Sequence, residues 1–139
     1  MPLRIVLDTN VLVSGLLNPR GAPGRIVDMI LMGEVQILYD DRILLEYHEA
    51  LRRPRFGFEE RDIRRVLDYL TFSGEAVAAL PIAFDMPDES DLPFIEVAVS
   101  GQADALVTGN VSHFASVENP GVMTPTGFLE FWAASSNRG

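Results

Sequence analysis

Three acidic side chains of this chain, Asp8, Glu46 and Asp91, stand where the sequence predicts that an element ends or turns inward. Asp8 directly follows the apolar run Leu3–Leu7, so its carboxylate is expected where a buried strand reaches the surface. An alternative interpretation is that Asp8 only caps a helix beginning near Asn10. Asp8 is therefore a candidate catalytic or metal-binding residue, and the neighbouring side chains decide between that role and helix capping.

Asp91 begins an expected helix over residues 91–100. At 100° per residue it lies near the middle of the apolar face of that helix, whereas Glu96 points away. The carboxylate of Asp91 should thus aim into the protein, although a first-turn acid can equally serve the helix dipole. The apolar face consists of Phe94, Ile95, Ala98 and Val99.

Glu46 lies on an expected helix over residues 42–53, at the edge of its apolar face and between Ile43 and Ala50. It is the acid of this helix best placed to face the sheet. The alternative is a boundary residue whose carboxylate reaches solvent.

Together the three acids suggest a metal site. Carboxylates brought close together repel one another, so either their pKa values rise or a cation binds. Hard oxygen ligands suit Mg²⁺ or Mn²⁺, which support phosphoryl chemistry. Two polar segments, Asp8-Thr9-Asn10 and Thr108-Gly109-Asn110, each follow an expected strand and would meet at the carboxyl edge of the sheet.

The elements that must position these residues alternate along the chain. Short apolar runs read as strands at 3–7, 35–39, 75–82, 103–108 and 122–124, and helical patterns occupy 10–17, 23–32, 42–53, 59–72, 91–100 and 126–134. A polar loop is expected over 83–90. This alternation predicts an α/β fold: a mostly parallel sheet with helices on both faces, in one domain over 1–134 with a frayed tail over 135–139.

Composition narrows the possible functions. The 139 residues carry a net charge of −9, which argues against nonspecific coating of nucleic acid. The chain has no cysteine and no lysine, so it has no thiolate zinc site, Schiff-base lysine or P-loop lysine. Its apolar runs are too short to span a membrane, and Asp8 comes too early for a signal peptide, so a cytoplasmic protein is expected.

The segments around the acids resemble those of PIN domains. Residues 5–14, Ile-Val-Leu-Asp-Thr-Asn-Val-Leu-Val-Ser, are similar to the opening of that family, and residues 45–51 are similar to its second acidic motif. Asp91 with Ala98 seven places on resembles the third motif. Residues 105–110 resemble the fourth, and residues 124–129 resemble the usual ending. The matches cover nearly the whole chain, in the right order.

The resemblance implies a metal-dependent ribonuclease, of the VapC type among toxin–antitoxin pairs. It implies that Asp8, Glu46 and Asp91 coordinate Mg²⁺ or Mn²⁺, and that the protein forms a homodimer and binds an antitoxin. Thr9, Asn10 and Thr108 are expected to support these ligands or contact substrate.

The chain departs from the family pattern at Asn110, where an acid is common. An amide oxygen can ligate a metal but brings no charge, so Asn110 is expected to be a weak ligand and a second metal is in doubt. The alternative function is a weakened PIN-like binding module that acts through a protein or RNA partner. A further alternative is another phosphoryl-transfer enzyme on the same architecture.

Six arginines fall between positions 52 and 65. Arg52, Arg53 and Arg55 are expected to bind RNA phosphates beside the acids. The stretch 61–65 reads instead as a solvated helix surface with acidic partners.

Overall fold

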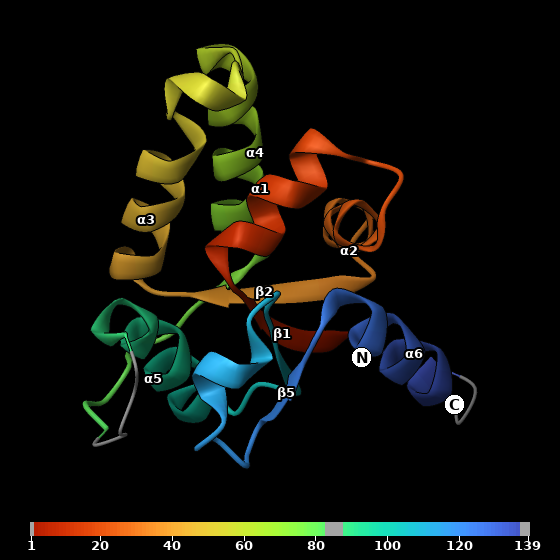
Figure 1. Ribbon diagram of the computed structural model, residues 1–139, viewed down its shortest axis with the longest axis vertical. Helices are drawn as coiled ribbons and strands as arrows, with labels where there is room; N and C mark the ends of the chain where they lie inside the picture. Colours follow the sequence, from red (N-terminus) through yellow and green to blue (C-terminus); the bar gives the residue numbers. More distant parts are fainter. Residues whose placement is uncertain (1, 83–87, 137–139) are drawn as a thin grey trace.

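The computed structural model describes residues 2–82 and 88–136. Within them, five strands form one parallel sheet in the order β3-β2-β1-β4-β5 (Figure 1). Because all the strands are parallel, their carboxyl ends meet at one edge. The strands are β1 (Leu3–Leu7), β2 (Val35–Tyr39), β3 (Glu75–Ala76), β4 (Ala105–Val107) and β5 (Gly121–Met123).

Helices cover both faces of the sheet, as parallel crossovers require. In Figure 1, α1 to α4 lie above β2, and α5 and α6 lie below it. The predicted α/β architecture is thereby confirmed. The helices are α1 (Thr9–Leu17), α2 (Ala22–Leu31), α3 (Asp41–Leu51), α4 (Glu60–Ser73), α5 (Leu92–Ser100) and α6 (Pro125–Ser136), with short 3₁₀ turns η1 (Pro54–Phe56), η2 (Glu89–Asp91) and η3 (Val111–Phe114).

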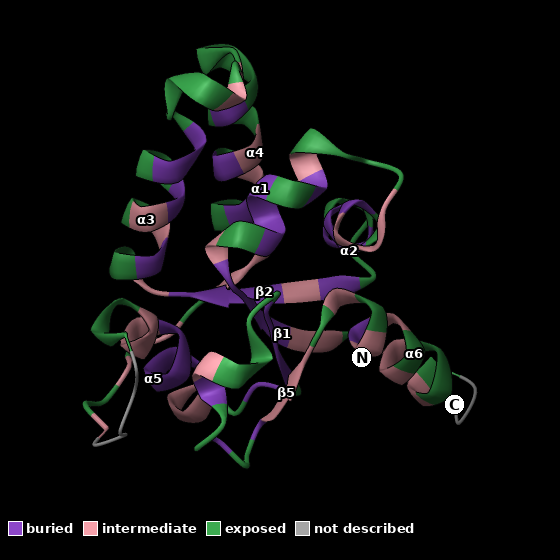
Figure 2. Cartoon of the chain, in the orientation of Figure 1, coloured by how far each residue is buried: buried purple, intermediate pink, exposed green. Residues whose placement is uncertain are grey.

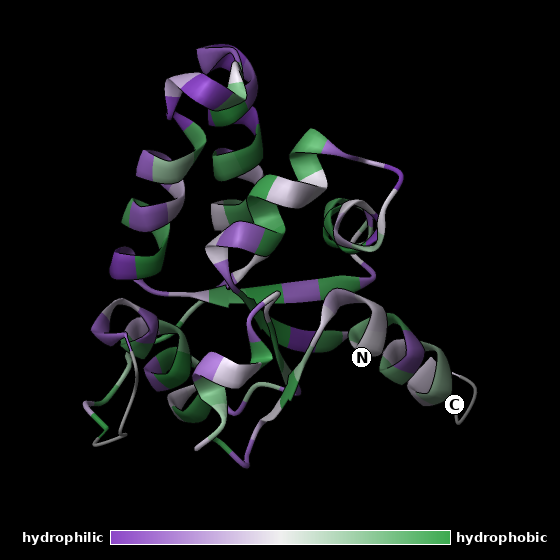
Figure 3. Cartoon of the chain, in the orientation of Figure 1, coloured by the Kyte–Doolittle hydropathy of each residue, from purple (hydrophilic) through white to green (hydrophobic). Residues whose placement is uncertain are grey.

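The two central strands form the middle of the core. Residues 5–7 of β1 and 105–107 of β4 are completely buried, because helices pack on both sides of them (Figure 2). This explains why both strands read as continuous apolar runs rather than alternating ones. The outer sides of α3 and α4 are hydrophilic, in keeping with helices that bury only one face (Figure 3).

The edges of the fold differ from the sequence prediction. The strand expected over 75–82 pairs with β2 only at Glu75–Ala76, and the amide of Val77 still donates to the carbonyl of Tyr39 at the end of β2. Beyond Tyr39 there is no partner strand left to pair with. The loop expected over 83–90 lies mainly outside the described residues, which resume at Asp88. Helix α6 continues to Ser136, into the predicted tail, and residues 137–139 lie outside the described part.

Candidate active site

Asp8 and Thr108 are neighbours at the carboxyl ends of β1 and β4. The parallel register pairs Leu7 with Val107, so the next residue of each strand emerges at the same place. The hydroxyl of Thr108 donates to Oδ2 of Asp8 at 2.7 Å. Asp8 occupies the N-cap position of α1 but makes no side-chain capping hydrogen bond. Its carboxylate therefore belongs to the sheet edge, and simple helix capping does not account for it.

Glu46 reaches the same edge from α3. The side chain is half-buried, and its Oε2 accepts a hydrogen bond from the hydroxyl of Thr9, the first residue of α1. The next residue of α3, Tyr47, is fully buried and donates its hydroxyl to the carbonyl of Leu7. These two hydrogen bonds fix α3 against the end of β1 and hold Glu46 beside Asp8.

Asp91 approaches from the start of α5. It too sits at an N-cap position without making a side-chain capping hydrogen bond. Its Oδ2 is buried and has no hydrogen-bond partner, while Nδ1 of His113 in η3 lies 3.4 Å away. This contact is an ion pair only when the imidazole is protonated, and a buried carboxylate oxygen without a hydrogen bond favours a proton or a cation beside it.

The pKa values of the three carboxyl groups are all raised. Burial raises the pKa of Asp8, against the lowering effect of the Thr108 hydrogen bond. Burial also raises the pKa of Glu46, with further increases from the charges of Asp8 and Asp91. The pKa of Asp91 is raised by burial and then by the charges of Asp8 and Asp88. Buried carboxylates within electrostatic reach of one another form a site that favours binding of a cation.

These acids line one pocket of about 390 Å³. Thr9, Asn10, Asn110 and His113 line the same pocket, and so does Asp88. Asn110 is exposed, and its backbone amide donates to the hydroxyl of Thr108, which in turn donates to Asp8. The sheet edge thus gathers the acidic residues and Asn110 that the sequence singles out.

The residues present fit a divalent metal ion. The donor set consists of carboxylate and amide oxygens, and among the described residues the buried Oδ2 of Asp91 has no hydrogen bond and only the 3.4 Å contact with His113. Within residues 2–82 and 88–136, however, no three acidic or histidine side chains stand close enough to form a complete metal-binding group. The pocket therefore contains suitable metal ligands, but they are not arranged around one point as in a complete metal site.

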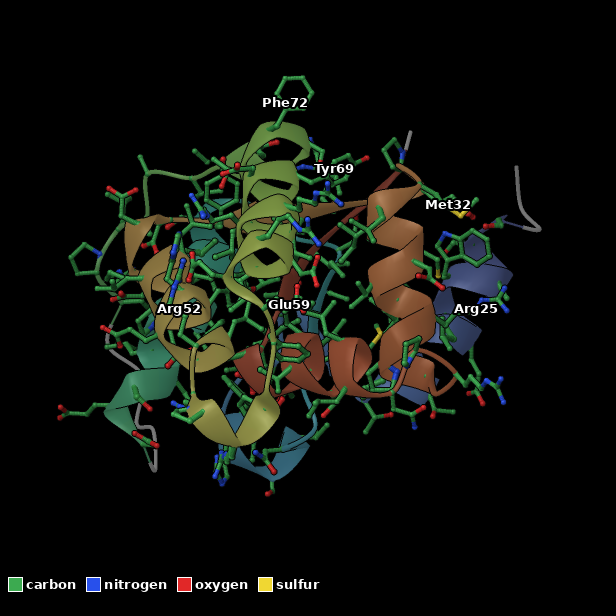
Figure 4. All side chains as sticks on the ribbon, turned by 90° about the horizontal axis from the view of Figure 1, so that it is seen from above. Arg25, Met32, Arg52, Glu59, Tyr69 and Phe72 are labelled. Atoms are coloured by element: carbon green, nitrogen blue, oxygen red, sulfur yellow. The ribbon has the colours of Figure 1, made fainter. Side chains whose placement is uncertain are left out.

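Two residues expected to contact substrate are engaged elsewhere. Thr108 is completely buried, so it orients Asp8 and offers no surface to RNA. The guanidinium of Arg52 binds both carboxylate oxygens of Glu60 on α4 and also contacts His48. Arg52 does not line the pocket, and in Figure 4 it lies along α3 on the side facing α4.

Arg53 and Arg55 do line the pocket, and neither forms an ion pair with another described residue. The charge of Arg53 lowers the pKa of Glu46, which places this cation within electrostatic reach of the acids. Because α3 ends at Leu51 and η1 follows, the chain turns these two side chains toward the pocket, whereas Arg52 stays with α4.

Glu96 corrects the helical-wheel prediction. The wheel predicts that it points away from the protein, yet it is only 5% exposed. Its two carboxylate oxygens accept from Nη1 of Arg42 at 2.6 Å and from the amide of Ile82 at 3.0 Å. A helical wheel that counts only apolar residues misses this position, because the burial of Glu96 depends on partners from two other segments.

Six described residues of the pocket are not among the predicted site residues: Val13, Ser14, Leu17, Phe56, Asp88 and His113. Asp88 caps η2 by accepting from the amide and hydroxyl of Ser90, and it adds negative charge near Asp91. Nδ1 of His113 lies 3.4 Å from Oδ2 of Asp91, a contact between η3 and the start of α5 that no sequence motif marks. Phe56 gives no chemical signal in the sequence, since a lone aromatic residue is most often a core residue.

Comparison with known proteins identifies the family. The sequence matches the PIN domain family over residues 4–112, which is most of the chain. The chain belongs to the PIN-domain family. PIN domains are generally nucleases that depend on divalent metals, and this supports a hydrolase activity for the pocket described above.

Individual relatives agree with this assignment. An uncharacterized protein of Methanocaldococcus jannaschii is 30% identical over 134 residues, covering 89% of this chain and 86% of the relative. The structure of PAE2754 from Pyrobaculum aerophilum matches with a TM-score of 0.59 at 20% identity, covering 95% of this PIN domain and 90% of that chain.

A structure of VapBC2 from Rickettsia felis, bound to a DNA fragment from the promoter, matches with a TM-score of 0.55 at 16% identity and covers 88% and 98% of the two chains. At these identities both structural likenesses concern the fold. No helix in the described part of the chain is long and apolar enough to cross a membrane.

Proposed function

We propose that this PIN domain is a Mg²⁺- or Mn²⁺-dependent endoribonuclease that hydrolyses RNA phosphodiester bonds. The observation that carries the proposal is the shared pocket of Asp8, Glu46 and Asp91, in which burial raises all three pKa values and the charge of Asp8 raises those of Glu46 and Asp91 further. Asp8 and Asp91 would hold the ion together with Glu46, and Asn110 would contribute a weaker, uncharged ligand. A bound ion would lower the pKa of a water molecule for attack on phosphorus and stabilise the charge that develops there.

The chain's own residues supply orientation. Thr108 fixes Asp8, and the hydroxyl of Thr9 fixes Glu46, so neither carboxylate has to reorganise when substrate binds. Asn10 lines the pocket, and its amide would contact a sugar or phosphate oxygen of the substrate. Arg53 and Arg55 supply the local positive charge that an acidic protein needs in order to hold RNA phosphates.

We further propose that the protein is the toxin of a toxin–antitoxin pair, acting in the cytoplasm as a homodimer. The likeness of its fold to VapBC2, a complex named for both components, supports this. Co-expression of this chain with the product of the neighbouring upstream gene tests it. A stable complex that relieves growth arrest is expected, and unimpeded growth on expression of this chain alone would count against a toxin.

The nuclease proposal is tested with purified protein and end-labelled RNA. Cleavage should require Mg²⁺ or Mn²⁺, stop with EDTA and disappear in Asp8→Asn. Cleavage that persists in both EDTA and Asp8→Asn would come from a contaminant. RNA that stays intact under every metal condition would contradict the proposal.

A second candidate function is a binding module without nuclease activity. It is favoured by the uncharged amide of Asn110 in the pocket and by the absence of a complete three-ligand group among the described residues. In that case the parent protein binds RNA or its protein partner without cutting RNA, and Asn110→Asp restores metal-dependent cleavage.

A further inference from the structure

The pocket continues beyond the acids along a wall of different chemistry. This wall is formed by Val13, Ser14 and Leu17 of α1 together with Arg53, Arg55 and Phe56 from the α3–α4 connection. Leu17 is 50% exposed although it is a large apolar side chain. Exposed arginines and an exposed leucine beside a half-buried aromatic ring, continuing directly from a polar site, are typical of a ligand-binding surface.

Two planar side chains are stacked in this wall. The guanidinium carbon of Arg55 lies 4.8 Å from the centre of the Phe56 ring. The Phe56 ring also packs against Phe58, with ring centres 6.0 Å apart. The cation–π contact places the guanidinium beside the ring, and Arg55 forms no ion pair with another described residue, so its guanidinium can stack on another flat group.

We propose that this wall is a subsite for one unpaired nucleobase, next to the nucleotide whose phosphate lies at the acids. The inference rests on the proposed nuclease function. The planar Arg55–Phe56 pair would stack on the base, Leu17 and Val13 would cover its apolar edge, and Arg53 would face the adjoining phosphate. Stacking of this kind accepts any base and has a strong electrostatic component.

An unpaired base is required because of how duplexes are built. In a duplex each base already stacks on two neighbours, so its flat faces are closed to a protein side chain, whereas unpaired bases in loops and single strands can be turned out and stacked on aromatic or guanidinium planes. The subsite therefore predicts a preference for single-stranded RNA or loops over paired stems.

The experiment measures stacking directly. Asp8→Asn protein is titrated into single-stranded RNA of about 12 nucleotides that carries 2-aminopurine at one position at a time, and into the same strand annealed to its complement. We expect 2-aminopurine fluorescence to be quenched strongly at one position, and the single strand to bind more tightly than the duplex. Phe56→Leu in the same background should remove the quenching and weaken binding roughly 5- to 50-fold.

Further variants separate stacking from folding. Phe56→Trp should keep the quenching, and Arg55→Lys should lose it while keeping the salt dependence of binding, because lysine retains the charge without the plane. Phe72→Leu is the matched control. Phe72 is 89% exposed and lies at the end of α4 opposite Glu59 and the η1 connection, as Figure 4 shows. The Phe72→Leu substitution should leave both the RNA affinity and the quenching of 2-aminopurine unchanged.

Several outcomes would overturn the subsite. If Phe56→Leu and Arg55→Lys bind RNA as tightly as the parent and still quench 2-aminopurine, the base does not stack on this wall. Equal affinity for single-stranded and duplex RNA would also contradict the subsite. If these variants weaken only the complex with a co-expressed protein partner, the wall is a protein-binding surface. Cleavage assays with Asp8 intact distinguish the two proposals. If only the subsite proposal fails, the parent protein still cuts RNA in a metal-dependent way, whereas if the nuclease proposal fails, neither the parent nor any variant cuts RNA.

Discussion

Oδ2 of Asp8 accepts a 2.7 Å hydrogen bond from the hydroxyl of Thr108, although the two residues are 100 positions apart in the chain. The parallel register of β1 and β4 creates this contact, because it pairs Leu7 with Val107. The same hydroxyl accepts the backbone amide of Asn110 at 3.0 Å. One buried threonine therefore connects the first and the last of the segments that carry the candidate site.

Replacing Thr108 by valine should destabilise the protein in a pH-dependent way. A hydrogen bond to an ionised carboxylate contributes about 1.5–3 kcal/mol, so Thr108→Val should lower the free energy of unfolding at pH 7 by about that amount. Because this hydrogen bond lowers the pKa of Asp8, the destabilisation should shrink at acid pH, where Asp8 is protonated. Urea unfolding at pH 7 and pH 4 measures both effects.

Thr108→Ser is the control, since it keeps the hydroxyl. It should show a smaller destabilisation with little pH dependence. A Thr108→Val penalty that is equal at both pH values would mean that the substitution affects only packing and that the hydrogen bond does not favour the charged form of Asp8.

Asp8→Asn should stabilise the metal-free protein at neutral pH. Burial raises the pKa of Asp8, so the folded state holds the proton more tightly than the unfolded state does. The free energy of unfolding should consequently fall as pH rises from the unfolded pKa, near 3.8, through the higher folded pKa, and it should stay reduced at pH 7. Asparagine removes this destabilisation while its amide oxygen can still accept from Thr108.

Thermal unfolding in EDTA tests the Asp8→Asn expectation. The variant should have a Tm a few degrees higher than the parent at pH 7, and the difference should vanish near pH 4. Added Mn²⁺ should raise the Tm of the parent more than that of the variant. A variant that is less stable than the parent at pH 7 in EDTA would show that the Asp8 carboxylate stabilises the metal-free fold.

The sequence was sufficient for the parts of the fold set by local patterns. β1 and β2 have the predicted bounds because buried parallel strands are unbroken apolar runs, and the three acids could be singled out because each stands at the end of such an element or on the inner face of a helix. Positions set by distant partners could not be predicted. Glu96 is buried through Arg42 and Ile82, and Arg52 is held by Glu60.

Arg53 and Arg55 should bind RNA, whereas Arg52 should not. Arg53→Glu and Arg55→Glu are expected to weaken RNA binding, and each should reduce the slope of log K against log salt by about 0.7, the value for one phosphate of a single strand that the protein no longer neutralises. Arg52→Glu is a charge-matched control from the same segment, because its guanidinium is held by Glu60 outside the pocket. Fluorescence anisotropy across a salt series measures affinity and slope together.

The Arg52 control decides between a specific site and general attraction. If all three reversals weaken binding and flatten the slope equally, RNA responds only to the net charge of the segment. A response limited to Arg53 and Arg55 supports a phosphate path along the pocket.

Asn110→Asp should tighten metal binding. The proposed ligands are the carboxylates of Asp8, Glu46 and Asp91 together with the exposed amide of Asn110, so three charges and one neutral group would hold the ion, and Asp88 adds a further negative charge at the pocket wall. Three charges suit one divalent ion, and a fourth would help to neutralise a second. We therefore expect calorimetric titration with Mn²⁺ to give one main site in the parent, and tighter binding with a second site in the variant.

The Asn110→Asp substitution should also destabilise the metal-free protein. Without metal, a further carboxylate at position 110 adds repulsion to the acids of the pocket, so Asn110→Asp should lower the Tm in EDTA at pH 7 and raise the pKa of its neighbours further. Mn²⁺ should reverse the order, because the ion binds the more charged pocket more strongly. Asn110→Ala keeps the backbone amide that donates to Thr108 and removes only the side chain, so it should leave the EDTA Tm near that of the parent and weaken Mn²⁺ binding slightly. Two equally tight Mn²⁺ sites in the parent protein would show that the amide at position 110 does not limit the charge of the site.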